Sequence, residues 1–150
     1  TKPSYESKFL TNIIQRSNKM KYLSNYIEEN QTKLFNKTGA FFAFGQDQFN
    51  KAKKKGINYV SLGSGLICPK DNVDRLLNDL DKIADKGRKQ DIEENGKKKI
   101  IWREFSNHEC QISMDPTDGI YALDGYGFTK DEILAEWKGY YSYCIENDLF

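Results

Sequence analysis

The sequence contains few of the residues from which catalytic or metal centres are usually built. Among 150 residues there is a single histidine, His108, and there are three cysteines at wide, unpatterned spacing. A disulfide framework or a closed zinc site would need more of these residues, in paired spacing. We therefore expect a reduced protein with no metal and no cofactor.

Long apolar runs are missing as well. No stretch approaches the roughly 20 apolar residues that cross a bilayer, and the first residues contain no apolar leader-type segment. A hydrophobic content of 38%, with 13% aromatic residues, is still sufficient for one core built largely on Phe and Tyr. These features predict a cytoplasmic protein without a membrane segment.

The net charge is close to zero, but the charges are distributed unevenly. Residues 1–70 carry 12 Lys and Arg against 4 Asp and Glu, whereas residues 106–150 carry 2 against 9. Two explanations remain open. Either the oppositely charged ends neutralise each other within the fold, or one of them faces a charged partner.

Apolar periodicity predicts helices over most of the chain. Between Tyr5 and Lys37 a seven-residue repeat predicts a helical hairpin with a break near Ser17-Asn18. A strongly amphipathic helix is expected to follow Pro69 and to end at Gly87. A capping box at Thr129 predicts the start of the last helix. The core-forming helical segments are expected at 76–83, 101–112 and 133–144.

Three short β-prone runs, at 40–44, 58–62 and 66–68, predict a small sheet. The glycine-rich link between the second and third runs predicts a hairpin. The sequence therefore predicts a mainly helical α+β protein of one domain with a small sheet of about three strands. Residues 1–37 would form the N-terminal helical hairpin and residues 38–150 the α+β body.

The segment from Ile100 to Met114 holds the only histidine. Ile101, Phe105, His108 and Ile112 recur at helical spacing, and Glu104 precedes His108 by one turn. We interpret His108 as a core imidazole that anchors this helix through a buried hydrogen bond to a neighbour. The central cluster that results, structural or functional, consists of Glu104, Asn107, His108, Glu109 and Cys110.

An enzymatic or metal-dependent use of Glu104, His108, Glu109 and Cys110 is the alternative interpretation. Two residues at i and i+2 of a helix point about 200° apart, so Cys110 and His108 could not form a nucleophile–base pair there. A zinc site would need further ligands that the sequence does not supply in suitable spacing. We predict no catalytic residue and no metal ligand.

Lysine and arginine clusters could follow a phosphate backbone, and the abundant Phe and Tyr could stack on bases. Runs of lysine are also common on solvated faces, so the clusters alone do not establish this function. The predicted basic surface comprises Lys51, Lys53, Lys54, Lys55, Arg88, Lys89, Lys97, Lys98 and Lys99.

The element Glu104-Phe-Ser-Asn-His-Glu-Cys110, followed by Asp115 and the Gly125–Thr129 opening of the last helix, resembles small uncharacterised phage and prophage proteins. The similarity spans roughly residues 38–150. It implies a mobile-element setting, in which small proteins without cofactors, anti-CRISPR proteins among them, bind and block a host defence machine.

The resemblance thus implies a non-enzymatic protein of the host cytoplasm that binds a host protein or a ribonucleoprotein such as a guide-RNA effector. A nucleic-acid-binding accessory protein is a further alternative, since direct contact with nucleic acid is compatible with the lysine clusters.

Overall fold

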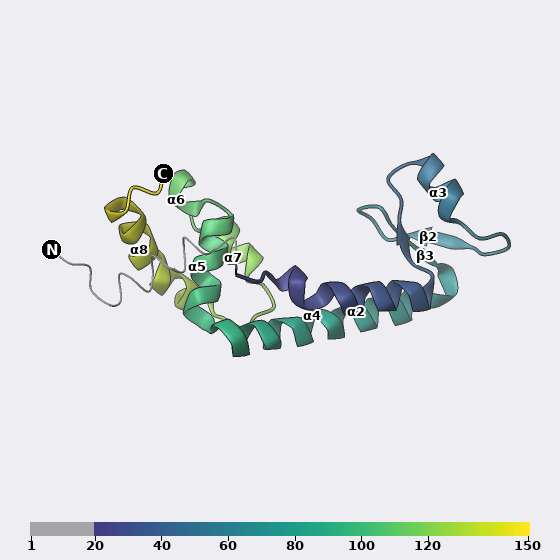
Figure 1. The fold of residues 1–150 in the computed structure, drawn as a ribbon, viewed down its shortest axis with the longest axis horizontal. Coiled ribbons are helices and arrows are strands. Elements are labelled where there is room, and N and C mark those ends of the chain that lie inside the picture. Colours follow the sequence, from purple (N-terminus) through teal and green to yellow (C-terminus); the bar gives the residue numbers. More distant parts are fainter. Residues whose placement is uncertain (1–19) are drawn as a thin grey trace. The chain divides into compact units, whose positions relative to one another are not determined.

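The computed structural model describes residues 20–150, and it confirms the predicted class of a mainly helical α+β protein with a small three-stranded sheet (Figure 1). The part of the predicted N-terminal hairpin before Met20, including the break near Ser17-Asn18, lies outside the described residues. The elements are α2 (Leu23–Thr38), β1 (Phe41–Phe42), α3 (Gln46–Ala52), β2 (Tyr59–Ser61), β3 (Leu66–Pro69), the 3-10 turn η1 (Lys70–Asn72), α4 (Val73–Asn95), α5 (Lys97–Asn107), α6 (Cys110–Ser113), α7 (Thr117–Ala122) and α8 (Lys130–Glu146).

The described residues form two compact units. The sheet unit is Ser24–Gly87, and the helical unit combines residues 20–23 with Arg88–Phe150. Helix α4 is continuous and contributes residues to both units. The predicted boundary at residues 37–38 does not coincide with this division, because α2 belongs with the strands.

The sheet unit contains an antiparallel sheet with the strand order β1-β3-β2. The predicted hairpin joins β2 and β3, and Gly63 and Gly65 adopt φ values of +93° and +81°, a region that only glycine enters without cost. The inner face of the sheet contributes Cys68 to a small core with Leu34 of α2 and Leu76 of α4. The small sheet thus shares its core with α2 and α4, a pairing of helices that the apolar periodicity does not predict.

The helical unit is built around α5 and α8. Trp102 and Phe105 of α5 lie in the core and contact Tyr140 of α8, with ring centroids 5.3 Å apart in both pairs. The predicted capping box is present: the Glu132 amide donates to the Thr129 hydroxyl, and the Thr129 amide donates to the Glu132 carboxylate, both at 3.1 Å. The three helical core segments predicted from the sequence therefore do contribute buried residues.

The predicted single helix over 101–112 is wrong. Helix α5 ends at Asn107, and Glu109 adopts the left-handed conformation with φ +50° before α6 begins. This turn places Cys110 in the core beside Gly119, which has no Cβ; a Cβ there would lie 2.6 Å from the Phe105 ring. Ile112 is consequently 53% exposed instead of sharing the buried face of α5.

Candidate functional site

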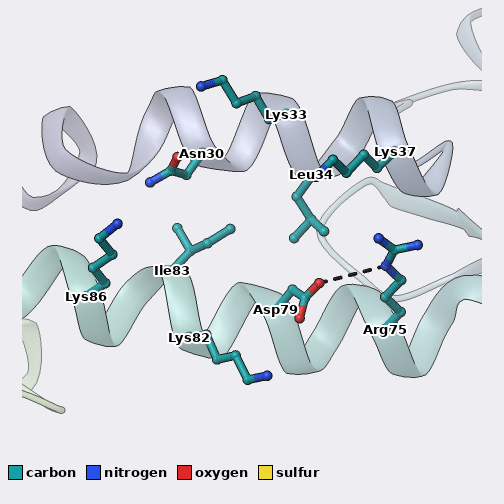
Figure 2. Close-up of a pocket in the computed structure, with 9 residues that line it drawn as sticks. All are labelled: Asn30, Lys33, Leu34, Lys37, Arg75, Asp79, Lys82, Ile83 and Lys86. Atoms are coloured by element: carbon teal, nitrogen blue, oxygen red, sulfur yellow. Dashed lines mark ion pairs between the residues drawn. The ribbon is translucent and has the colours of Figure 1, made fainter.

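A groove between α2 and α4 is a concave surface of the sheet unit that is lined largely by charged residues (Figure 2). It encloses about 350 Å³. Leu34 and Ile83 point into the space between the two helices, and the ammonium group of Lys86 points toward α2. The lining residues are Asn30, Lys33, Leu34, Lys37, Arg75, Asp79, Lys82, Ile83 and Lys86.

The charge of the groove is unbalanced. Five of its residues are cationic and only Asp79 is anionic. The guanidinium of Arg75 lies 3.9 Å from Asp79, and the ammonium of Lys33 lies 3.1 Å from Glu29. The remaining cations, Lys37, Lys82 and Lys86, are exposed and form no ion pair within residues 20–150. Like charges held together in this way attract an anionic ligand.

The groove was not predicted from the sequence, because its cations do not form a run. Lys33 and Lys37 are four residues apart, as are Lys82 and Lys86, so each pair lies on one face of its helix. Two pairs of lysines at i, i+4 spacing are the sequence signal from which two cationic helix faces could be predicted. The sequence does not show that the two faces border a common groove.

The predicted basic residues are divided between the two units. Lys51 lies in α3 and Lys53–Lys55 follow it, all of them exposed in the sheet unit. Arg88 and Lys89 lie in α4, and Lys97–Lys99 open α5, in the helical unit. The predicted basic surface is therefore distributed over two separate units.

The structure does not bring the predicted central cluster together at one site. Glu104 and Cys110 are buried, whereas Asn107, His108 and Glu109 are exposed. Among residues 20–150 there is no group of three or more His, Cys, Asp and Glu side chains placed to hold a metal ion. Because its members point to different environments, the cluster does not form a pocket in which acid, base and nucleophile could act together.

His108 itself is not the buried anchor that the helical periodicity predicts. Its side chain is 37% exposed, and its Nε2 lies 3.7 Å from Oε2 of Glu104, which is too long for a hydrogen bond. The prediction was wrong because α5 ends at Asn107, so that His108 occupies the C-terminal cap and lies outside the buried stripe.

Replacing His108 by alanine should therefore change the free energy of unfolding by no more than about 0.5 kcal/mol, since substitutions at exposed positions usually have effects of this size. Urea denaturation at pH 7 measures this. Phe105→Ala is the reference for a truly buried position on the same helix and should lose about 3–5 kcal/mol. A loss above about 1 kcal/mol for His108→Ala would support a buried role for the imidazole instead.

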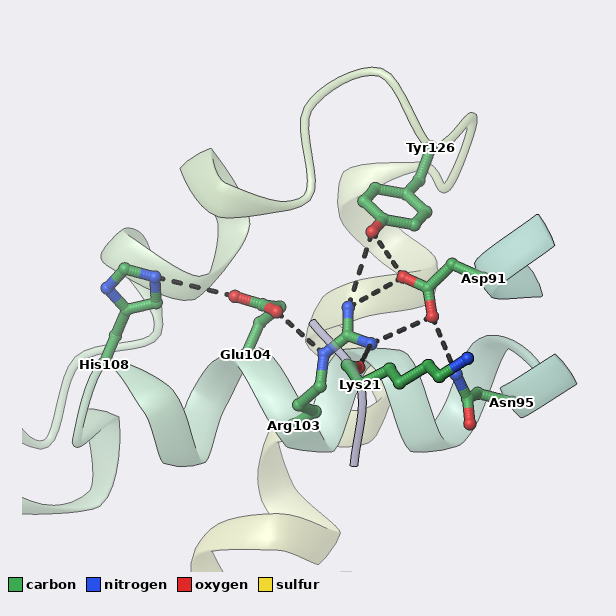
Figure 3. A network of polar contacts seen from close by, with 7 residues as sticks. All are labelled: Lys21, Asp91, Asn95, Arg103, Glu104, His108 and Tyr126. Carbon is green, nitrogen blue, oxygen red and sulfur yellow. Dashed lines mark hydrogen bonds and ion pairs between the residues drawn. The ribbon is translucent and has the colours of Figure 1, made fainter. Parts of the chain in front are cut away.

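The polar centre of the helical unit is a buried ion pair between Asp91 of α4 and Arg103 of α5 (Figure 3). Two guanidinium nitrogens donate to the two carboxylate oxygens of Asp91, each at 2.9 Å, and both side chains are 0% exposed. The Tyr126 hydroxyl and the Asn95 amide also donate to Asp91, at 2.5 and 2.8 Å. The remaining guanidinium Nε donates to Glu104 at 2.9 Å.

The contacts of this network determine the protonation states of Asp91 and Tyr126. Burial raises the pKa of Asp91, but hydrogen bonds from Arg103, Tyr126 and Asn95, together with the Arg103 charge, lower it further than burial raises it. Burial and the neighbouring Asp91 carboxylate raise the pKa of Tyr126. At neutral pH the carboxylate is therefore ionised and the phenol protonated. The charges of Asp91 and Arg103 are paired with each other and are inaccessible to solvent. The network therefore stabilises the fold and offers no surface to a ligand.

The fold and the groove together define a small, mainly helical α+β protein with a cationic interhelical groove. The chain belongs to a family of unknown function, DUF7659, whose family model matches residues 23–143. No curated protein and no solved structure matches the chain. Within residues 20–150, none of the helices combines the length and the apolar character that a membrane span requires.

The match covers most of the described residues, including both helices of the groove and the Asp91–Arg103 pair. It assigns no activity and no partner. The similarity to phage and prophage proteins stays a prediction.

Proposed function

We propose that this protein is a non-enzymatic binding protein whose α2–α4 groove binds the phosphate backbone of a nucleic acid, either free or exposed on a ribonucleoprotein. The observation that carries the proposal is the gathering of five cationic side chains around one groove with a single carboxylate. Phosphate contacts of this kind supply most of the affinity of sequence-independent nucleic-acid binding.

The dimensions of the groove suit several consecutive phosphates. Its cations on α4 run from Arg75 to Lys86, which corresponds to about 16 Å at a rise of 1.5 Å per residue. Phosphates of one strand follow each other at about 3.4 Å along a stacked helix axis. The groove is thus long enough for about four or five phosphates, which is similar to its number of cations.

The floor of the groove favours nucleic acid over an acidic amphipathic helix. A helix bound in a groove is held mainly by apolar side chains that enter apolar pockets. Here Leu34 is buried, Ile83 is half-buried, and the accessible side chains at the rim are cationic. Leu34 therefore offers almost no surface to a partner helix, whereas the cationic groups at the rim are available to phosphates.

The cysteines give no support to the alternative of a small enzyme. Burial raises the pKa of the Cys110 thiol, and burial also raises the pKa of Cys68 and of Cys144. A thiol must be ionised to act as a nucleophile, so none of these side chains is prepared for that role. In the mobile-element setting implied by the sequence resemblance, binding to the nucleic acid of a defence effector would be sufficient to block it.

Fluorescence anisotropy with a labelled 20-nucleotide single strand at 50 mM NaCl tests the proposal. We expect the wild-type protein to bind with a Kd of about 1–100 μM or tighter. The triple variant Lys37→Gln/Lys82→Gln/Lys86→Gln should bind at least about 10-fold more weakly, because three phosphate contacts are lost.

The matched control is Lys53→Gln/Lys54→Gln/Lys55→Gln, which removes the same charge from the same unit outside the groove. We expect it to keep its affinity within about 3-fold, as a general loss of charge has a smaller effect than loss of direct contacts. Equal losses in the two variants, or no binding by the wild-type protein, would contradict the proposal.

A further inference from the structure

The sheet unit also presents an exposed pair of parallel aromatic rings. The rings of Phe42 and Phe44 have centroids 6.2 Å apart and planes only 1° from parallel. Phe42 is 49% exposed and Phe44 is 76% exposed. The ring of Phe35 in α2 packs against the ring of Phe42, with a centroid distance of 5.5 Å. Phe44 therefore contributes little to the core while presenting a large aromatic surface to solvent.

The position of Phe44 is fixed by its surroundings although its ring is exposed. Its backbone amide donates to Oε1 of Gln48 at 2.7 Å, and the amide of Ala43 donates to the carbonyl of Gly65 at 2.8 Å. Gly65 lies directly against the ring, since a Cβ at this glycine would be 2.5 Å from Cε1 of Phe44. A ring held in place in this way loses little conformational entropy when a ligand stacks on it.

The polar groups around Phe44 match the parts of a nucleotide. A hollow of about 290 Å³ beside the ring is lined by Phe44, Gly45, Gln46, Asp47 and Gln48. Amide and carboxylate side chains can form hydrogen bonds with the edge of an unpaired base whose face is stacked on an aromatic ring. A carboxylate in this position would repel a phosphate, so the hollow suits the base and not the backbone.

A cation for the adjoining phosphate is also within reach. Lys51 follows Gln48 by three residues in α3, so their Cβ atoms lie about 5–6 Å apart on one face of the helix. Gln48 contacts Phe44 directly, and Lys51 is exposed. An aromatic ring, hydrogen-bonding groups and a cation thus adjoin each other, as in sites for single-stranded nucleic acids.

We infer that the surface formed by Phe44, Gln46, Asp47 and Lys51 binds an unpaired nucleotide, with its base stacked on Phe44. This inference rests on the proposed function, because it takes the ligand to be a nucleic acid. It adds that the protein prefers single strands, because the bases of a duplex are paired and stacked on one another and do not expose their faces.

The test compares a single-stranded 20-mer with a duplex of the same length, using wild type, Phe44→Ala and Phe44→Tyr. We expect Phe44→Ala to weaken single-strand binding by about 5- to 100-fold and to leave duplex binding within about 2-fold. Phe44→Tyr keeps the aromatic face and should bind like wild type. The fluorescence of a 2-aminopurine base in the single strand should change on binding to wild type and to Phe44→Tyr, because the base leaves the stack of its neighbours, but not on binding to Phe44→Ala.

A single-strand affinity and a 2-aminopurine fluorescence change that are the same in Phe44→Ala as in wild type would overturn the inference. This would be the result if Phe44 contacts an apolar protein segment instead. The groove variant separates this outcome from a failure of the proposed function. If Lys37→Gln/Lys82→Gln/Lys86→Gln weakens the binding of both nucleic acids while Phe44→Ala weakens neither, the groove proposal stands alone. If only Phe44→Ala weakens binding, the inference stands without the groove. Binding of neither nucleic acid by wild type would overturn both.

Discussion

Replacing Asp91 by alanine is expected to lower the free energy of unfolding by about 3–5 kcal/mol, because the buried Arg103 guanidinium loses its two bonds to this carboxylate and, among the described residues, keeps only Glu104 as a carboxylate partner. The Arg103 guanidinium is 0% exposed and donates to both oxygens of this carboxylate. Urea denaturation followed by circular dichroism measures the loss. Glu93→Ala, at an exposed position on the same helix, should change the stability by less than about 0.5 kcal/mol.

The double variant Asp91→Leu/Arg103→Met removes both charges. It should recover part of the stability lost in Asp91→Ala, since an apolar pair of similar volume is often equivalent to a buried ion pair, although Glu104 loses its Arg103 partner in the double variant. A loss below about 1 kcal/mol in Asp91→Ala, or a double variant less stable than the single one, would contradict the assigned role of this pair.

The same interaction determines how stability depends on pH. The folded-state pKa of Asp91 is lowered, so the carboxylate stabilises the fold at all pH values above its unfolded pKa, which is about 3.9. This contribution is lost as the pH falls below about 4 and through the folded-state pKa. Wild-type stability should therefore decline more steeply below pH 4 than that of Asp91→Ala, when both are measured by urea denaturation.

The salt dependence of nucleic-acid binding should be steep. Three to five contacts between groove cations and phosphates of a single strand predict a slope of log Kobs against log salt of about −2 to −3.5. Raising NaCl from 50 to 200 mM should then weaken binding by about 20- to 100-fold. The range of contact numbers reflects the carboxylate partners that Lys33 and Arg75 already have.

The groove variant provides the control for this prediction. Because Lys37, Lys82 and Lys86 form no ion pair within the described residues, their loss should reduce the slope by about 0.7 for each contact. Anisotropy titrations at four salt concentrations measure both slopes. A slope near zero for wild type, or identical slopes in wild type and variant, would exclude the groove as a phosphate-binding surface.

Local sequence patterns predicted the parts of the fold that depend on neighbouring residues. The Thr129 capping box, the glycine-rich hairpin and the apolar stripe of α4 each involve residues close in the chain, and each is present. Gly87 was expected to end α4, but the helix continues to Asn95. Tertiary packing accounts for the difference: Asp91 and Ile92 enter the helical unit, which outweighs a glycine cost of about 1 kcal/mol.

The candidate sites were harder to predict because they depend on contacts between distant residues. Arg103 stands in an apolar run and pairs with Asp91, and nothing in the spacing of the two residues indicates the pair. The end of α5 at Asn107 and the left-handed turn at Glu109 go together with the packing of Cys110 near Gly119. The groove likewise requires α2 and α4 to lie side by side. Each of these features is set by tertiary packing and has no local signature.

The measurement that tests the central claim most directly is an NMR titration of the labelled protein with a single-stranded oligonucleotide. The account predicts that the largest amide shift changes lie at residues 30–37 and 75–86, the two helical segments that line the groove. The changes should be reduced at 200 mM NaCl and absent from those segments in Lys37→Gln/Lys82→Gln/Lys86→Gln. Shift changes confined to residues 88–99, or an unperturbed groove at saturating oligonucleotide, would contradict the account.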